Sequence, residues 1–157
     1  MALSLATLKD GLERDWMVPE GGAFPPSTLV SAQRFAAVVS RWFGAAQANG
    51  LPCSTAAARE LQLAALAAGA LQLGEAEAVG AALAGAVAAY IAGQSFGPGV
   101  ATGPVALPLA AVSLGRAFAD LDAAPSQRAQ SLAEACQNLA LTTPVSFPTP
   151  PFVGPIT

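Results

Sequence analysis

The stretch from Ala78 to Ser95, AVGAALAGAVAAYIAGQS, carries no charge and consists almost entirely of alanine, glycine and valine. Its 18 residues reach the short end of a membrane span, and small residues recur at four-residue spacing from Gly80, a pattern that brings membrane helices together. Leu83 and Ile91 are its only large aliphatic residues other than valine, however, and no lysine or arginine flanks it closely. We therefore interpret the stretch as a helix packed closely inside a water-soluble bundle, with the hydroxyl of Tyr90 reaching the edge of the bundle.

Apolar residues recur every three or four positions along much of the chain, which is the spacing of amphipathic helices. The first such helix covers residues 5–16, and a second begins at the capping residue Ser27 or Thr28 and continues to Phe43. Gly74 divides the alanine-rich run that follows into helices at 55–73 and 75–94, because glycine favours a helix end and the next residues include carboxylates. One continuous helix with a tolerated glycine is the alternative.

The second half of the chain predicts two more helices, one around residues 112–121 and one that begins near Ser126 and continues to residue 140. The glycine and proline residues between 93 and 108 indicate a loop, and Asn49–Gly50 is typical of a helix C-terminus. No window shows the alternation of a β-strand. The predicted fold class is all-α, a bundle of five to six helices.

The segment TTPVSFPTPPFVGPIT differs from everything before it, because five prolines alternate with apolar side chains. Proline removes backbone donors and favours an extended conformation, so this segment is predicted to be an extended arm, 142–157, attached to a helical bundle domain, 1–141. An extended arm that carries apolar side chains gains little by folding back alone, and we expect it to dock on a neighbouring subunit. The expected inter-subunit contacts are Phe147, Phe152, Val153 and Ile156. A disordered or self-packed tail is the alternative.

The sequence offers few groups for catalysis. The absence of histidine removes Ser-His and Cys-His nucleophile activation and most metal sites. The carboxylate pairs Glu75/Glu77 and Asp120/Asp122 are spaced for solvated helix positions, and the glycines of GPGVATGP lack the lysine of a phosphate-binding loop. Cys53 and Cys136 match no zinc spacing and are expected to be small buried hydrophobes, with pairing left open. We expect no catalytic residue, no metal, no cofactor and no small-molecule substrate.

Composition points to association with other proteins. Hydrophobic residues make up 54% of the 157, more than a core of this size needs, so some apolar surface is expected to meet another chain. The seven lysine and arginine residues are spread without a basic cluster, which argues against direct recognition of nucleic acid.

Three stretches, SLATLKDGL (Ser4–Leu12), PPSTLVSAQRFAAVVSRWF (Pro25–Phe43) and FGPGVATGP (Phe96–Pro104), resemble the alanine-rich small proteins encoded among the virion and tail genes of tailed bacteriophages. The resemblance implies a structural virion component of the neck or tail, including the baseplate, that is made in the host cytoplasm and contacts copies of itself and other virion proteins. It assigns no site residues. The expected function is a non-enzymatic structural subunit, and the alternative is a small, holin-like, membrane-active helical protein.

Overall fold

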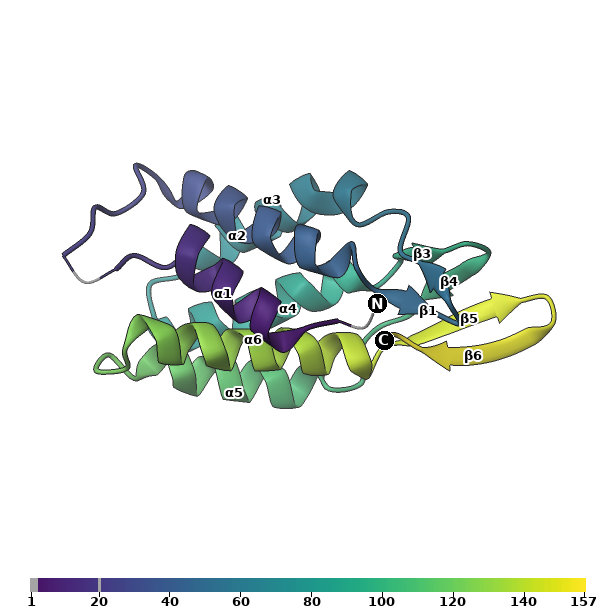
Figure 1. Cartoon of the computed structure of the whole chain (residues 1–157). Helices are drawn as coiled ribbons and strands as arrows, with labels where there is room; N and C mark the ends of the chain where they lie inside the picture. Colours follow the sequence, from purple (N-terminus) through teal and green to yellow (C-terminus); the bar gives the residue numbers. More distant parts are fainter. Residues whose placement is uncertain (1–2, 20) are drawn as a thin grey trace.

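Within residues 3–19 and 21–157, which the computed structural model describes, six α-helices form a closed ring in chain order (Figure 1). Each helix packs against the next one, and the last packs against the first. The helices are α1 (Leu5–Asp15), α2 (Thr28–Phe43), α3 (Glu60–Leu71), which follows the 3₁₀ turn η1 (Ala57–Arg59), α4 (Ala76–Ile91), α5 (Leu107–Ala119) and α6 (Pro125–Leu141). Met1, Ala2 and Glu20, which belong to the predicted domain 1–141, lie outside the described residues.

The helices begin and end at signals that are visible in the sequence. The hydroxyl oxygens of Ser4 and Ser27 accept hydrogen bonds from the N–H groups of Thr7 and Val30 at 3.3 and 3.2 Å, which caps α1 and α2. Gly74 lies in the short turn between α3 and α4. The predicted division of the alanine-rich run into a helical hairpin is therefore confirmed.

The prediction of an all-α fold is wrong, because each of α2, α4 and α6 is followed by a β-hairpin. The strands are β1 (Gln47–Ala48), β2 (Leu51–Pro52), β3 (Ser95–Phe96), β4 (Gly99–Ala101), β5 (Pro144–Pro148) and β6 (Pro151–Pro155). Across the described ranges they form a two-stranded antiparallel sheet, β1-β2, and a four-stranded antiparallel sheet, β3-β4-β5-β6. Both sheets lie at the same end of the helical ring (Figure 1). Four of these strands have only two or three residues, too few to show an alternating pattern.

Two-residue turns connect the strands of each hairpin. Asn49 and Gly50 have φ angles of 51° and 75°, as in the type I′ turn whose twist matches antiparallel strands, so their interpretation as a helix C-terminus is wrong. In the second hairpin, Gly97 has a φ of 59° at the first turn position, a conformation that suits glycine.

The predicted extended arm is also wrong in its conformation, because residues 144–155 fold back as the β5–β6 hairpin and pair with β4. Pro144 lies opposite Pro155 and Pro148 opposite Pro151. Pairs in an antiparallel ladder alternate between hydrogen-bonded and non-hydrogen-bonded, so these proline pairs occupy the positions that need no N–H between the two strands. The arm can therefore carry several prolines and still form a sheet.

Hydrogen bonds between hairpins join the two sheets at both edges into one closed circuit. Ser54 N–H donates to Ser95 O, Thr102 N–H to Pro144 O and Thr157 N–H to Gln47 O, at 2.9, 2.9 and 2.8 Å. At each joint the hydroxyl of the donating residue also donates to the same carbonyl, at 3.2, 3.1 and 3.4 Å. The three joints are thus chemically equivalent, although their residues are far apart in the chain.

The described chain accordingly consists of three consecutive units, each a helical hairpin followed by a β-hairpin. The second helices of the units, α2, α4 and α6, begin at Thr28, Ala76 and Pro125, which are 48 and 49 residues apart. Residues at the same spacing share their burial: the sets are Phe35, Leu83 and Leu132; Ala36, Ala84 and Ala133; and Val39, Val87 and Cys136, all of which are fully buried. The core is therefore built from three approximately equivalent sets of side chains that are arranged around the axis of the helical ring.

Candidate functional site

The four predicted contact residues of the C-terminal segment divide into a buried pair and an exposed pair. Phe147 and Ile156 are 5% and 1% exposed, and belong to the hydrophobic core of their own chain. Phe152 and Val153 are 38% and 64% exposed on β6. Only this second pair remains available, in the described chain, for substantial contact with another protein.

Phe147 anchors the hairpin to its neighbour. Its ring stacks on that of Phe152, with centroids 4.6 Å apart and an angle of 3° between the ring planes. A side-chain carbon on Gly99 of β4 would overlap the Phe147 ring, so glycine is required there for the strand and the ring to approach each other. The exposed face of Phe152 is therefore held in a fixed position at the tip of the β5–β6 hairpin.

The ionisable residues considered for catalysis do not gather into a reactive cluster. Glu75, Glu77, Asp120 and Asp122 are all exposed. Where the structure describes the chain, no group of three cysteine, aspartate or glutamate side chains lies close enough to hold a metal ion. The glycine-rich segment that follows α4 forms β3 and β4 rather than a phosphate-binding loop.

Both cysteines are free thiols. Burial raises the pKa of Cys136 to about 12, and burial also raises the pKa of the half-buried Cys53. The Cys53 thiol donates to Gln94 Oε1 at 3.5 Å. A thiol whose pKa is raised carries little thiolate at neutral pH, so neither cysteine is activated as a nucleophile.

A buried polar cluster, which no sequence pattern indicated, lies where the chain passes from the first unit to the second. The expectation that the Tyr90 hydroxyl reaches the bundle edge is wrong: Tyr90 is fully buried, its hydroxyl donates to Ala56 O at 2.9 Å, and burial raises its pKa to about 12. Gln94, also fully buried, accepts a bond from Thr55 Oγ1 at 2.6 Å and donates to Tyr90 O at 3.1 Å. Arg59 donates to the last carbonyls of α4, including Tyr90 O at 3.0 Å. These bonds satisfy buried groups and hold the segment between β2 and α3 against the end of α4.

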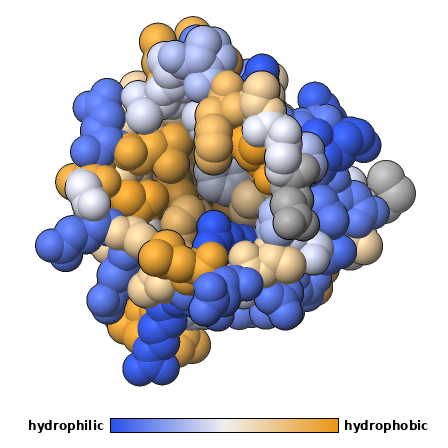
Figure 2. Space-filling model, turned by 90° about the vertical axis from the view of Figure 1, so that its left-hand side faces the viewer, coloured by the Kyte–Doolittle hydropathy of each residue, from blue (hydrophilic) through white to orange (hydrophobic). Residues whose placement is uncertain are grey.

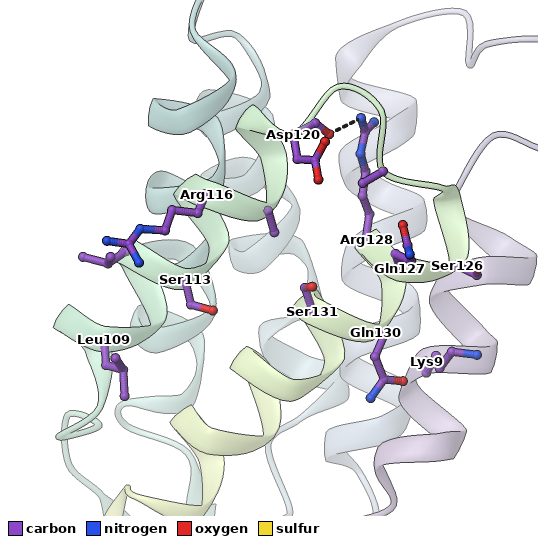
Figure 3. Close-up of a pocket in the computed structure, with 13 residues that line it drawn as sticks. Lys9, Leu109, Ser113, Arg116, Asp120, Ser126, Gln127, Arg128, Gln130 and Ser131 are labelled. Atoms are coloured by element: carbon purple, nitrogen blue, oxygen red, sulfur yellow. Dashed lines mark hydrogen bonds between the residues drawn. The ribbon is translucent and has the colours of Figure 1, made fainter.

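A groove of about 910 Å³ runs between α5 and α6 (Figure 3). Leu109 and Val112 supply apolar lining from α5, while Ser113 and Ser131 come from opposite walls. Cationic side chains stand at its rim, from three different helices: Lys9, Arg116 and Arg128. We call this feature the α5–α6 groove.

Arg128 is held at the end of the α5–α6 groove that is farther from the sheets, where α5 ends and α6 begins. Its Nη2 donates to Asp120 O at 2.8 Å (Figure 3). Its Nε is buried and has no hydrogen-bond partner among the described residues. The guanidinium therefore keeps unused donor capacity at this end of the groove.

A second hollow lies at the end of the bundle that faces away from the sheets. Figure 2 looks onto this end and shows hydrophobic side chains around a central depression. The hollow has a volume of about 860 Å³, and its lining includes Trp16, Met17, Phe24, Leu121 and Pro125. Phe24 and Leu121 are among the most exposed large apolar residues of the described chain.

The first helices of the three units, α1, α3 and α5, differ sharply in the charge of their exposed residues. We call these three the outer helices. The exposed positions of α1 include Asp10, Glu13 and Arg14. The exposed residues of α3 and the turn after it carry no charge from Leu61 to Gly74, and α5 exposes Leu109 and Val112. Sequence periodicity could not find these surfaces, because α3 has apolar residues on all sides and its pattern does not separate inside from outside.

In the part of the chain that the structure describes, no helix has both the length and the apolar character needed to cross a membrane. Comparison with protein-family models, with curated proteins and with solved structures gives no match to this chain.

Proposed function

We propose that this chain is a non-enzymatic structural subunit of a large assembly, a component of the neck or tail, including the baseplate, of a tailed bacteriophage virion. In this proposal it is made in the host cytoplasm, and its partners are copies of itself and other virion proteins. The phage context comes from the sequence resemblance described above. The assembly role is supported by one structural observation, the contrast between the outer helices of its three units.

That contrast supports an assembly role because the units provide their own comparison. The outer helices α1, α3 and α5 occupy equivalent places in the ring, yet α1 exposes three charged side chains and α5 exposes only Arg116, beside leucine and valine. From Leu61 onward, α3 exposes no charge. Leu61 is 78% exposed and Leu109 is 70% exposed. Burying apolar surface contributes about 25 cal/mol per Å², and monomeric proteins rarely leave large contiguous apolar patches in water. Helices covered by neighbouring subunits account for this distribution.

The C-terminal hairpin offers a further contact in the same proposal. Phe152 and Val153 present apolar surface at a tip that projects beyond the rest of the sheet (Figure 1). We propose these two residues as inter-subunit contacts, with Phe147 and Ile156 supporting them from within the chain.

The experiment is mass spectrometry of purified particles from the host that carries this gene, combined with labelling of the chain for electron microscopy. We expect the chain in intact particles, at a fixed ratio to the other virion proteins and in the neck or tail. A chain found only in the soluble fraction of lysed cells, and never in gradient-purified particles, would contradict the proposal. An unrelated cytoplasmic protein of similar abundance serves as the control for contamination.

A further inference from the structure

The exposed face of α3 is uncharged and rich in leucine, a composition typical of a helix that packs against another protein. Seven residues form this surface, which we call the α3 face: Leu61, Gln62, Ala65, Leu66, Gly69, Gln72 and Leu73. None of them is charged. Leu66 and Gly69 are three positions apart and lie on one side of α3, and Leu73 follows in the turn just after the helix. This spacing is that of a helix that inserts its apolar side into a groove of another protein.

The α5–α6 groove matches the α3 face in length and in lining. The α3 helix extends over about 15 Å from Leu61 to its last residue, Leu71, at 1.5 Å per helical residue, and Leu73 lies just beyond it. The groove extends over about 17 Å from Leu109 to Asp120 by the same measure. Leu109 and Val112 give the groove an apolar wall, and the small side chains of Ser113 and Ser131 face each other from its two walls.

Charge at the ends of the two surfaces fixes their relative direction. Glu75 is exposed just beyond the end of the α3 face. Arg116 and Arg128 lie toward one end of the α5–α6 groove, on its opposite walls, and the exposed Asp120 carboxylate lies between them (Figure 3). Because α3 and α5 both run away from the sheets, Glu75 and the two arginines lie at the same end of the molecule (Figure 1). Two copies with parallel axes therefore bring the Glu75 carboxylate to the arginines of the neighbour.

The two surfaces lie on opposite sides of the molecule. In Figure 1, α3 is at the top of the helical ring and α5 is at the bottom. One copy can therefore use its α3 face toward one neighbour and its groove toward another at the same time. A contact between two different surfaces leaves one of each unused, so it continues to a further copy.

We propose that the α3 face of one copy docks into the α5–α6 groove of the next copy, with the helical axes parallel and Glu75 facing Arg116 and Arg128. Repetition of this contact produces a closed ring or a filament in which all β-hairpins lie on the same face. The inference rests on the proposed function as a subunit of an assembly and names the contact by which copies associate. The occupant of both surfaces is a second copy of this chain.

The test uses one variant on each surface of the full chain. Leu66→Lys places a charge in the middle of the α3 face, and Leu109→Lys places one on the groove wall; both positions are exposed, so folding is expected to survive. We expect each variant alone to remain monomeric in sedimentation velocity at concentrations where the unmodified chain associates. Ala6→Lys, on the exposed side of α1, is the matched control and should associate like the unmodified chain.

Mixing the two variants distinguishes the proposed contact, which joins two different surfaces, from any symmetric contact, in which both copies use the same surface. The Leu66→Lys chain keeps an intact groove and the Leu109→Lys chain keeps an intact α3 face, so the mixture should form a dimer with one copy of each, visible by native mass spectrometry. It should not continue beyond the dimer. A mixture that stays monomeric, or variants that associate like the unmodified chain, would overturn the proposed contact. So would an unmodified chain that stays monomeric at the highest concentration reached, since another protein would then cover these surfaces.

A charge reversal provides a second readout that does not depend on the leucines. Glu75→Arg or Arg116→Glu alone should weaken association a few-fold, with the effect reduced by salt, because exposed ion pairs are weak and screened. The chain that carries both reversals should regain part of the lost affinity, because Arg128 still lies near position 75. Failure of this rescue would overturn the pairing of Glu75 with Arg116, and failure of the mixing experiment would overturn the contact as a whole. Recovery of the chain in purified particles would still support the proposed function, so the two can fail separately.

Discussion

The N–H of Thr157 donates to the carbonyl oxygen of Gln47 at 2.8 Å, and the N–H of Gln47 donates back to Thr157 O at 2.9 Å. This reciprocal pair joins residues 110 positions apart and closes the circuit of hairpins at its third joint. The neighbouring side chain, Ile156, is almost completely buried. The C-terminal residues are therefore part of the framework that holds the first unit to the third.

Alanine substitutions on β6 and just after it test this role. Ile156→Ala removes a buried side chain and is expected to cost about 2–5 kcal/mol of unfolding free energy. Val153→Ala changes an exposed side chain and should stay within about 0.5 kcal/mol. Urea unfolding followed by circular dichroism measures both. Equal, small effects would mean that the C-terminal segment does not belong to the cooperative fold.

Two glycines of α4 provide a matched comparison of the close helix packing. A side-chain carbon on Gly80 would overlap the backbone carbonyl of Leu114 in α5, so Gly80→Ala should cost about 1–3 kcal/mol through overpacking. Nothing lies within 4 Å of the corresponding position on Gly85. Gly85→Ala should therefore stabilise the protein by up to about 1 kcal/mol, because alanine has the higher helix propensity. Thermal unfolding of the two variants should shift in opposite directions, and a shared sign would contradict this account of the α4–α5 contact.

The helices were predictable because their signals are local. Ser4, Ser27 and Gly74 mark boundaries through capping and chain-turning chemistry that acts within a few residues. The hairpins were less visible, because pairing depends on partners far away in the chain. Asn49–Gly50 between apolar residues was a usable hairpin signal, but the same dipeptide also suits a helix end.

The three-fold repeat was hidden because equivalent positions share a physical property and not a residue type. Phe43, Ile91 and Ala140 occupy equivalent buried places, with volumes that differ widely. Of the predicted contact residues, Phe147 and Phe152 could not be told apart by composition, since the register of one hairpin decides which ring is covered. The exposure of the leucines of α3 could not be predicted either, because apolar residues occur on all sides of that helix.

Tyr90→Phe tests the buried polar cluster. The variant loses the hydrogen bond to Ala56 O, and we expect a cost of about 0.5–1.5 kcal/mol. The value should lie toward the lower end, because the Ser40 hydroxyl also donates to this carbonyl at 3.2 Å. Combining Tyr90→Phe with Ser40→Ala removes both side-chain donors and should cost more than the two single changes together. Simple additivity in the double-mutant cycle would contradict a shared role.

The stability of the protein should fall at alkaline pH. The folded state raises the pKa of Cys136 from 9.0 to about 12 and that of Tyr90 from 10.0 to about 12, so both groups stay neutral in the folded chain after they ionise in the unfolded one. Their contribution is fully present below pH 9 and is lost as the pH rises toward 12. Once a group titrates in the unfolded state, each further pH unit should cost about 1.4 kcal/mol.

Cys136→Ala is the control for this pH dependence. It should reduce the slope of unfolding free energy between pH 9 and 10 and leave the fall above pH 10 that Tyr90 causes. Some slope should remain below pH 10, because the pKa of Cys53 is also raised by burial. Urea midpoints measured at several pH values give the slopes directly, and identical slopes for the two proteins would rule out the thiol as a contributor.

The prolines of β6 are expected to protect the part of its outer edge that extends beyond the joint between Thr157 and Gln47. Because Pro151 and Pro155 lie in non-hydrogen-bonded pairs with β5, their backbone nitrogens face outward, as does that of Val153 between them. Proline has no N–H to offer, so Val153 alone in this segment can donate to an incoming strand. The double variant Pro151→Val with Pro155→Val adds two outward donors and should increase self-association, measured as light scattering and thioflavin fluorescence over time. Val153→Pro should have the opposite effect, because it removes the remaining donor at a position where the ladder to β5 needs none. If the double valine variant aggregates no faster than the unmodified chain, some other feature of the hairpin protects this edge.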